Sequence, residues 1–276
     1  MRKFVSPALI STIIGLVIHF SALNNYFINL SYDTLTNLRS SSEKASGVVI
    51  IGIDDASLSK YDKTNMGIIP REIYTELLNK LKKWAPKAAA FDIIFDIKTG
   101  NEQHDSFIEA IENFGGRIIL SSYFQRTPDH SSENYITPYE QSGLKNASWG
   151  YVNVFRGIFE DDDLIRRRFR PFERIENKIV YSLPLALAES AYSVEISNTF
   201  DRVNMFDREN KNIKMSLPLS SGYSYISYSG NIDGFHVLTL DDVISATGVQ
   251  AEIFEKLVRN KIVLIGSISP RHRDIQ

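Results

Sequence analysis

The stretch KAAAFDIIFD (87–96) decides the fold, because its apolar residues predict a buried strand. Two carboxylates, Asp92 and Asp96, bracket three of those apolar residues. In an extended strand these carboxylates share a face and lie roughly 13 Å apart, at about 3.3 Å per residue. They cannot form a close acid pair while the strand continues between them, so each needs its own explanation.

The residues before this strand complete a strand–helix–strand unit. VVIIGID (48–54) is a nearly continuous β-branched run, as expected for a strand buried on both faces. From Arg71 to Trp84, apolar residues recur at helical spacing, and Pro86 ends the predicted helix. We therefore predict a parallel pair of strands joined by a right-handed crossover.

The alternation of strands and helices continues to the end of the chain, which predicts an α/β fold with a mostly parallel sheet flanked by helices. We expect residues 125–148 to form a long polar insertion and residues 197–222 to be polar and irregular. The other predicted elements are helices at 105–114, 182–192, 241–247 and 251–258, and strands at 117–124, 149–155, 223–228 and 261–267.

Composition excludes several kinds of chemistry. The 276 residues contain no cysteine, which removes thiol catalysis, thiolate metal sites and disulfides. The net charge of −2 gives no reason to expect a nucleic-acid partner. The five histidines are scattered, so we expect no zinc site. No glycine-rich phosphate loop and no nucleophile elbow occurs in the sequence.

The N-terminus predicts a membrane anchor. Arg2 and Lys3 precede an apolar stretch, roughly Val5–Leu23, that is about long enough to cross a bilayer as a helix. The basic pair indicates that the N-terminus stays in the cytoplasm. Residues 1–30 are then the basic tip and transmembrane helix, and residues 31–276 form an extracytoplasmic domain. A cleaved signal peptide and a buried core helix are the alternatives.

A group of charged residues should meet where the predicted parallel strands end. Asp54, Asp55 and Asp96 follow strands, and Arg71 begins the intervening helix. Ligands gather beyond the carboxyl ends of parallel strands, so we predict that these four residues line a ligand pocket. The acids could also bind Mg²⁺ or Ca²⁺. The favoured alternative is structural, with the aspartates capping turns and Asp92 acting as a buried anchor.

A second charged stretch, EDDDLIRRR (160–168), consists of four acidic residues followed, after Leu164 and Ile165, by three arginines. Such a run could be a calcium loop or a docking surface. Most runs of this kind are solvated turns, and we expect one here.

Several motifs, in their order and spacing, are similar to those of a known family. They are IIGIDDASL, PREIYTELLNKL, AAAFDIIFD, D-x-x-x-x-A-I from Asp105, GYVN, D-x-D-x-x-x-R, YSLPLALA and KIVLIGS. Over roughly residues 33–276 the chain resembles the second family of CHASE domains, the cyclase/histidine kinase-associated sensory extracellular domains of bacteria.

The resemblance implies an extracytoplasmic sensor that is not itself an enzyme. We expect no cofactor, with a divalent cation as the alternative. The resemblance implies one preceding membrane helix, further helices after the domain, and a cytoplasmic cyclase or kinase output. It also implies a homodimer that responds to a small-molecule or protein signal. Asp163 and Arg167 would be structural anchors. The other matched positions are Asp33, Arg39, Asp54, Ser57, Pro70, Arg71, Asp92, Phe95, Gly150, Asn153, Asp161, Gly266 and Asp274.

The chain departs from the family pattern in two places. Asp163-Leu164 stands where the family commonly has Asp-Gly. The sequence ends at RHRDIQ, before the expected membrane helices, so we expect a shortened receptor or a natural sensor fragment. Two other functions stay open: a periplasmic metal-dependent hydrolase or phosphatase, and an assembly module without a small ligand.

Overall fold

A computed structural model describes residues 11–12, 15–16, 22–39, 47–62, 67–95, 101–115, 117–126, 133–137, 144, 147–153, 166–175, 178–227 and 234–269. The helices are α2 (Ala22–Arg39), α3 (Asp55–Tyr61), α4 (Arg71–Trp84), α5 (Asn101–Glu112), α6 (Leu183–Tyr192), α7 (Leu240–Ser245) and α8 (Gly248–Val258). The strands are β1 (Val48–Ile53), β2 (Ala88–Ile94), β3 (Ile118–Arg126), β4 (Glu133–Ile136), β5 (Ser148–Tyr151), β6 (Arg168–Phe169), β7 (Phe172–Ile175), β8 (Lys178–Tyr181), β9 (Val194–Asn198), β10 (Arg202–Asp207), β11 (Ile213–Pro218), β12 (Ser224–Tyr225), β13 (His236–Thr239) and β14 (Ile262–Ser267).

Among the described residues, the main sheet has seven strands, in the order β13-β1-β14-β2-β3-β4, with β5 also paired to β3. All of its pairings are parallel except β3 with β4. The α/β class and the mainly parallel sheet predicted from the sequence are therefore confirmed. The sequence prediction did not include β13, the short edge strand beside β1.

The predicted direct pairing of β1 with β2 is wrong. β14 lies between them and pairs with both, so the sheet is completed by the last strand of the chain. Because adjacent strands are about 4.8 Å apart, the ends of β1 and β2 are separated by roughly 10 Å. This separation bears on the predicted strand-end pocket, which assumed neighbouring strands.

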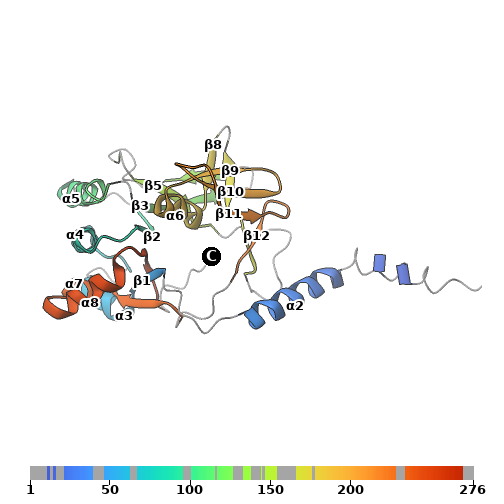
Figure 1. The fold of residues 1–276 in the computed structure, drawn as a ribbon. Helices are drawn as coiled ribbons and strands as arrows, with labels where there is room; N and C mark the ends of the chain where they lie inside the picture. Colours follow the sequence, from blue (N-terminus) through green and yellow to red (C-terminus); the bar gives the residue numbers. More distant parts are fainter. Residues whose placement is uncertain are drawn as a thin grey trace, which may run out of the picture.

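One face of the sheet is covered by α3, α4, α5, α7 and α8, as Figure 1 shows. The amphipathic α4 presents Tyr74, Leu77, Leu78 and Leu81 to the core, as its helical spacing predicts. Alternate strand residues point to this face, among them Phe91 of β2. The main hydrophobic core thus lies between the sheet and these helices.

The other face is covered by α6, which packs on β2, β3 and β5 in the described part of the chain. Beyond α6 lies a second, smaller assembly of short strands, the antiparallel sheet β11-β10-β9 and the hairpin β7-β8 (Figure 1). Residues 197–222 were expected to be irregular, and that prediction is wrong. Val203 and Met205 of β10 are buried while intervening residues are more exposed, so outward polar side chains hid the strand pattern.

α2 extends from the body at one end of the molecule (Figure 1). Most of the predicted membrane span, Val5–Leu23, lies outside the described residues. Among the helices that the structure describes, none is both long enough and apolar enough to cross a membrane. The anchor and the boundary at residue 30 therefore stay predictions.

Candidate sensor site

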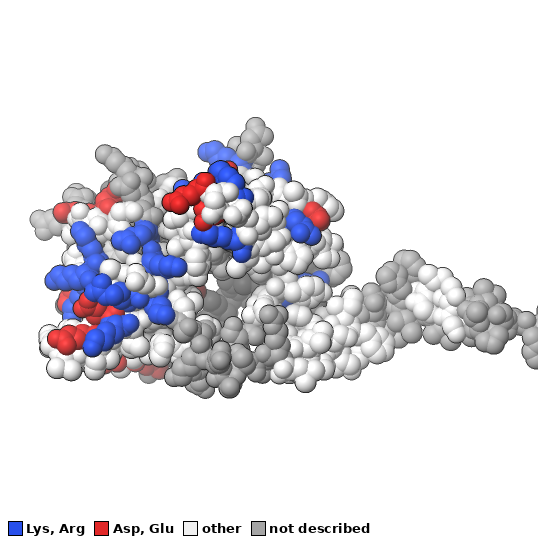
Figure 2. All heavy atoms as spheres, in the orientation of Figure 1, with Lys and Arg blue, Asp and Glu red and all other residues white. Residues whose placement is uncertain are grey.

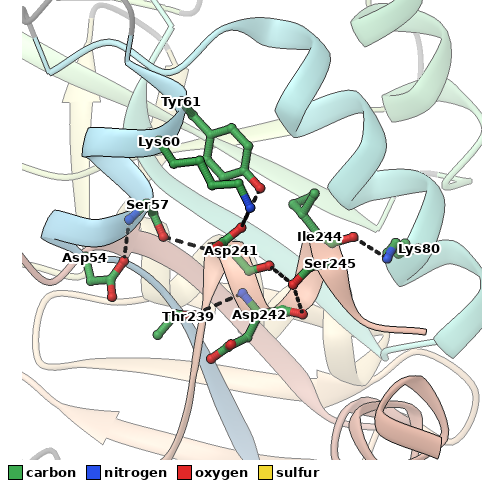
Figure 3. Close-up of polar contacts among 10 residues, drawn as sticks. All are labelled: Asp54, Ser57, Lys60, Tyr61, Lys80, Thr239, Asp241, Asp242, Ile244 and Ser245. Atoms are coloured by element: carbon green, nitrogen blue, oxygen red, sulfur yellow. Dashed lines mark hydrogen bonds and ion pairs between the residues drawn. The ribbon is translucent and has the colours of Figure 1, made fainter. Parts of the chain in front are cut away.

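The predicted strand-end acid Asp54 caps a helix. Its carboxylate accepts a hydrogen bond of 2.8 Å from the backbone N–H of Ser57, at the start of α3. The Ser57 hydroxyl in turn accepts a 3.2 Å bond from the backbone N–H of Asp241 in α7 (Figure 3). This chain of bonds joins the first turns of two helices that follow the adjacent strands β1 and β13.

Asp241 extends the same network to the last turn of α3. The Lys60 ammonium, 2.5 Å away, and the Tyr61 hydroxyl, 2.7 Å away, donate to its carboxylate (Figure 3). These hydrogen bonds, first that of Lys60, lower the pKa of Asp241. The network holds α3 against α7, so the polar residues at this strand end stabilise the packing of the two helices.

Asp55 and Arg71 also contact parts of the fold. The Asp55 carboxylate accepts a hydrogen bond from the hydroxyl of Ser269, which follows β14. Arg71 is buried, and its guanidinium carbon lies 4.3 Å from the ring centre of Phe95 and 5.6 Å from that of Phe107. Arg71 thus closes an aromatic cluster on the helical face.

The ligand-pocket hypothesis for these residues stays untested. Asp96, its fourth member, lies outside the described residues. Across the described ranges, no three His, Asp or Glu side chains are grouped so that they could hold a metal ion.

Two of the three predicted anchors lie in the described part of the chain. Asp92 is exposed, so the prediction that it is buried is wrong, and its role as a structural anchor stays a prediction. The physical reason is strand alternation: Phe91 faces the helix-covered core, and Asp92 faces the opposite side. Asp163 lies outside the described residues. Arg167 is only 2% exposed, although the run that contains it was expected to be solvated.

Arg167 attaches α2 to the body. Its guanidinium donates two hydrogen bonds of 2.7 Å to the two carboxylate oxygens of Asp33. This fork geometry fixes both the distance and the orientation of the two side chains. Tyr32, the residue before Asp33 in α2, adds two contacts to the body. Its hydroxyl donates to the carbonyl of Ile226, and its ring centre lies 5.3 Å from that of Tyr225.

Beside this attachment is a cavity of about 250 Å³. It lies where the end of β2, the end of β5, the first turn of α6 and the segments around β6 and β12 meet. The described residues that line it are Asp92, Tyr151, Val152, Asn153, Arg166, Arg168, Phe169, Arg170, Ser182, Leu183, Pro184, Tyr223 and Ile226. Arg166 and Arg168 flank the buried Arg167, and the N–H of Ile226 donates to the Arg167 carbonyl at 2.9 Å. The cavity wall is therefore bonded directly to the α2 attachment.

Three residues of the GYVN motif, Tyr151, Val152 and Asn153, also line the cavity. A Cβ on Gly150 would lie 2.6 Å from the Leu183 Cα, so only glycine allows β5 to approach the start of α6 this closely. Burial raises the pKa of the Tyr151 phenol, which stays protonated and donates to the Arg170 carbonyl at 2.5 Å. The Asn153 amide donates to the Phe124 carbonyl at 2.8 Å.

Sequence reasoning missed most of this cavity. In the sequence, Arg166 and Arg168 stand out only as part of a charged run and Ser182 only as the start of a helix, and Arg170 does not stand out. Alternate spacing of the three arginines was the available signal, because residues i, i+2 and i+4 of an extended segment share a face.

The sequence matches the model of one protein family, the CHASE2 domain, over residues 9–276. The chain belongs to the CHASE2 family. CHASE2 is a second family of CHASE sensory domains, and its members are extracellular sensory domains of membrane receptors, not catalytic ones. No curated protein and no solved structure gives a significant match to this CHASE2 chain.

Proposed function

We propose that this CHASE2 chain is the input domain of a bacterial membrane receptor, with residues 31–276 outside the cytoplasmic membrane. The output would be a cytoplasmic cyclase or kinase. The observation that carries the proposal is the paired contact of Arg167 with Asp33. It links the body of the domain to α2, the helix that continues from the predicted membrane span.

The proposed response to a signal is a change in how firmly α2 is attached to the body of the domain. The cavity shares its wall with the Arg167 and Ile226 contacts to α2. A signal that binds better to one arrangement of this wall shifts the receptor toward that arrangement. Rearrangement at the wall would then move α2 and, through it, the membrane helix.

The surface of α2 supports its position near the membrane. Between Tyr26 and Leu38 the helix carries a single charged residue, Asp33. Figure 2 shows lysine and arginine side chains gathered on the helical side of the body, whereas α2 is largely uncharged. Its exposed large apolar residues are Tyr26, Phe27, Ile28, Leu30, Leu35 and Leu38.

We also propose that the receptor works as a homodimer in which two α2 helices face each other. Leu38 is 80% exposed, and the chain contains no native cysteine. An L38C variant in membranes should therefore form a cross-linked dimer on mild oxidation. A cysteine at another highly exposed position, on the body of the domain, F200C, serves as the control. Equal cross-linking of both variants, or none of L38C, would remove α2 from the interface.

Thiol labelling of spheroplasts, whose cytoplasmic membrane is intact, tests the proposed location. Phe200 is 92% exposed, so F200C should react with a membrane-impermeant maleimide added to spheroplasts. A cysteine at Arg2 (R2C) should react only after lysis, because the N-terminus is proposed to be cytoplasmic. Labelling of F200C that also requires lysis would refute the extracytoplasmic placement.

A further inference from the structure

The first turn of α6 contains a buried hydroxyl without a hydrogen-bond partner among the described residues. Ser182 is the N-cap residue of α6 and is 4% exposed, yet its side chain makes no capping bond. An N-cap serine ordinarily accepts a bond from the helix. A buried polar group without a partner costs free energy, so Ser182 needs a partner from the cavity that it lines.

The charges around this hydroxyl favour an anion. Among the described residues that line the cavity, Arg166, Arg168 and Arg170 carry positive charges and Asp92 carries a negative one. Arg170 already binds the Glu173 carboxylate and donates to the Tyr223 hydroxyl at 3.0 Å, which fixes its position in the wall. The N-terminal end of α6 adds a partial positive charge from the helix dipole.

The rest of the wall favours an apolar body on the same ligand. The apolar side chains that line the cavity are Val152, Phe169, Leu183, Pro184 and Ile226, and Tyr151 and Tyr223 add aromatic surface. A volume of about 250 Å³ lies just below the range of about 300–1,000 Å³ that holds drug-sized ligands. The space therefore suits a small molecule with one anionic end.

We propose that the cavity binds a small organic carboxylate with an apolar body, with its anionic group at Ser182 and the arginines. If the chain is the proposed sensor, this carboxylate belongs to the class of molecules that it senses. Only that biological role rests on the proposed function, because binding itself does not depend on it. Since Ile226 and the 166–168 segment also hold α2, the bound carboxylate would stabilise the attached position of α2.

The first experiment is a thermal-shift and calorimetric titration of the full chain in detergent, at constant ionic strength. Benzoate and 4-methylpentanoate are the probes, and benzamide and 4-methylpentanamide are neutral controls of nearly the same shape. At ten times its dissociation constant, a carboxylate should raise the melting temperature by about 3–6 °C. The amides and inorganic phosphate should have no such effect.

Substitutions then locate the bound group. R168Q should weaken carboxylate binding about tenfold or more, and S182A about two- to tenfold. D92N should strengthen binding, because it removes the opposing charge. The control R202Q changes an exposed arginine of β10 and should leave binding unchanged. If R168Q does not fold, R166Q replaces it, since Arg166 is exposed.

Each remaining result would overturn the proposal. No shift with any carboxylate means that the cavity is not an anion site. Equal shifts with the amides mean an apolar cavity, and equal shifts with phosphate mean that the apolar wall is not used. Weaker binding by D92N would mean that the Asp92 carboxylate attracts the ligand, and therefore that the ligand carries a cationic group there. Binding is measured directly, so its failure is distinct from a failure of the thiol labelling that tests the receptor location.

Discussion

The two faces of the main sheet use different chemistry. On the helical face, α3, α4, α5, α7 and α8 cover apolar strand residues, and the aromatic cluster around Phe91 is fully buried. On the other face, the described cover consists of α6 and short antiparallel strands, and arginines, tyrosines and a serine surround a cavity. The first face stabilises the domain, whereas the second face carries the groups able to respond to a ligand.

This difference teaches where a signal can act. A close-packed apolar core transmits strain but offers no polar group to an incoming molecule. The second face connects the cavity to α2 through two short polar contacts, at Arg167 and Ile226. Changes on the helical face should alter stability alone, and changes on the other face should alter the attachment of α2.

The largest effect should come from the helical face. Phe91 is fully buried, and its ring packs edge-on against Tyr74 and Phe95, with centroids 5.7 and 5.4 Å away. F91A should lower the free energy of unfolding by about 3–5 kcal/mol, through lost burial and the cavity that remains. Urea denaturation followed by tryptophan fluorescence measures this, with F200A as the exposed control. A loss below about 1 kcal/mol would contradict the asymmetry of the two faces.

The next effect should come from the α2 attachment. D33N removes the Asp33 carboxylate from the buried Arg167 charge, while R167M replaces that charge with an apolar side chain. Because the Asp33 side chain is 35% exposed, we expect a cost for D33N of about 1–3 kcal/mol, below that of a fully buried pair. The double-mutant cycle should show coupling between the two sites.

Hydrogen exchange shows whether that cost is local. D33N should accelerate exchange in Tyr26–Leu38 and leave the helical face protected. The control E195Q removes one partner of an exposed ion pair with Lys211 and should leave α2 unchanged. Unchanged exchange of α2 in D33N would mean that Arg167 does not hold the helix.

The sequence predicts the helical face better than the other face, for a physical reason. The predicted helix from Arg71 to Trp84 is confirmed as α4, because one buried stripe imposes a clear 3.6-residue period. The order of the strands did not follow from local pattern. β14 comes from the far end of the chain and pairs with both β1 and β2. The local sequence of β1 and β2 does not indicate that a distant strand lies between them.

The cavity was harder to predict because its residues come from distant segments. The signal at Gly150 is steric and becomes visible only when Leu183 is placed against it. Charged runs are usually solvated, and that expectation concealed the burial of Arg167. By contrast, the structural alternative for Asp54 was that it caps a turn, and in the structure its carboxylate accepts a hydrogen bond from the backbone N–H of Ser57 at the start of α3.

A smaller effect is expected at Asp54, where capping and ligand binding make different predictions. If its role is the cap of α3, D54A should cost about 1 kcal/mol of stability, and the exposed control E76A should be nearly neutral. The same urea titrations measure both. Unchanged stability together with a lost ligand response would favour the strand-end pocket instead.

The smallest effect should come from the turn that joins β10 to β11, the hairpin that the sequence did not predict. A hydrogen bond from the Lys214 ammonium, helped by the backbone amides of Glu209 and Asn210, lowers the pKa of Asp207 to about 2. Its value in the unfolded chain is about 3.9. A lowered pKa in the folded state stabilises the fold above pH 4, and that contribution is lost as the pH falls from about 4 to 2.

D207N should therefore be less stable than the wild type. The difference in the free energy of unfolding should be constant near neutral pH and shrink across this acidic window. An NMR titration of the Asp207 carboxyl carbon measures the pKa directly, and K214M should raise it toward 3.9. The Lys214–Asp207 pair is partly exposed to solvent, so salt should weaken the effect. An ordinary pKa for Asp207 at low salt would show that the Lys214 ammonium and the two backbone amides do not stabilise the ionised carboxylate, and that this contact adds nothing to the stability of the turn.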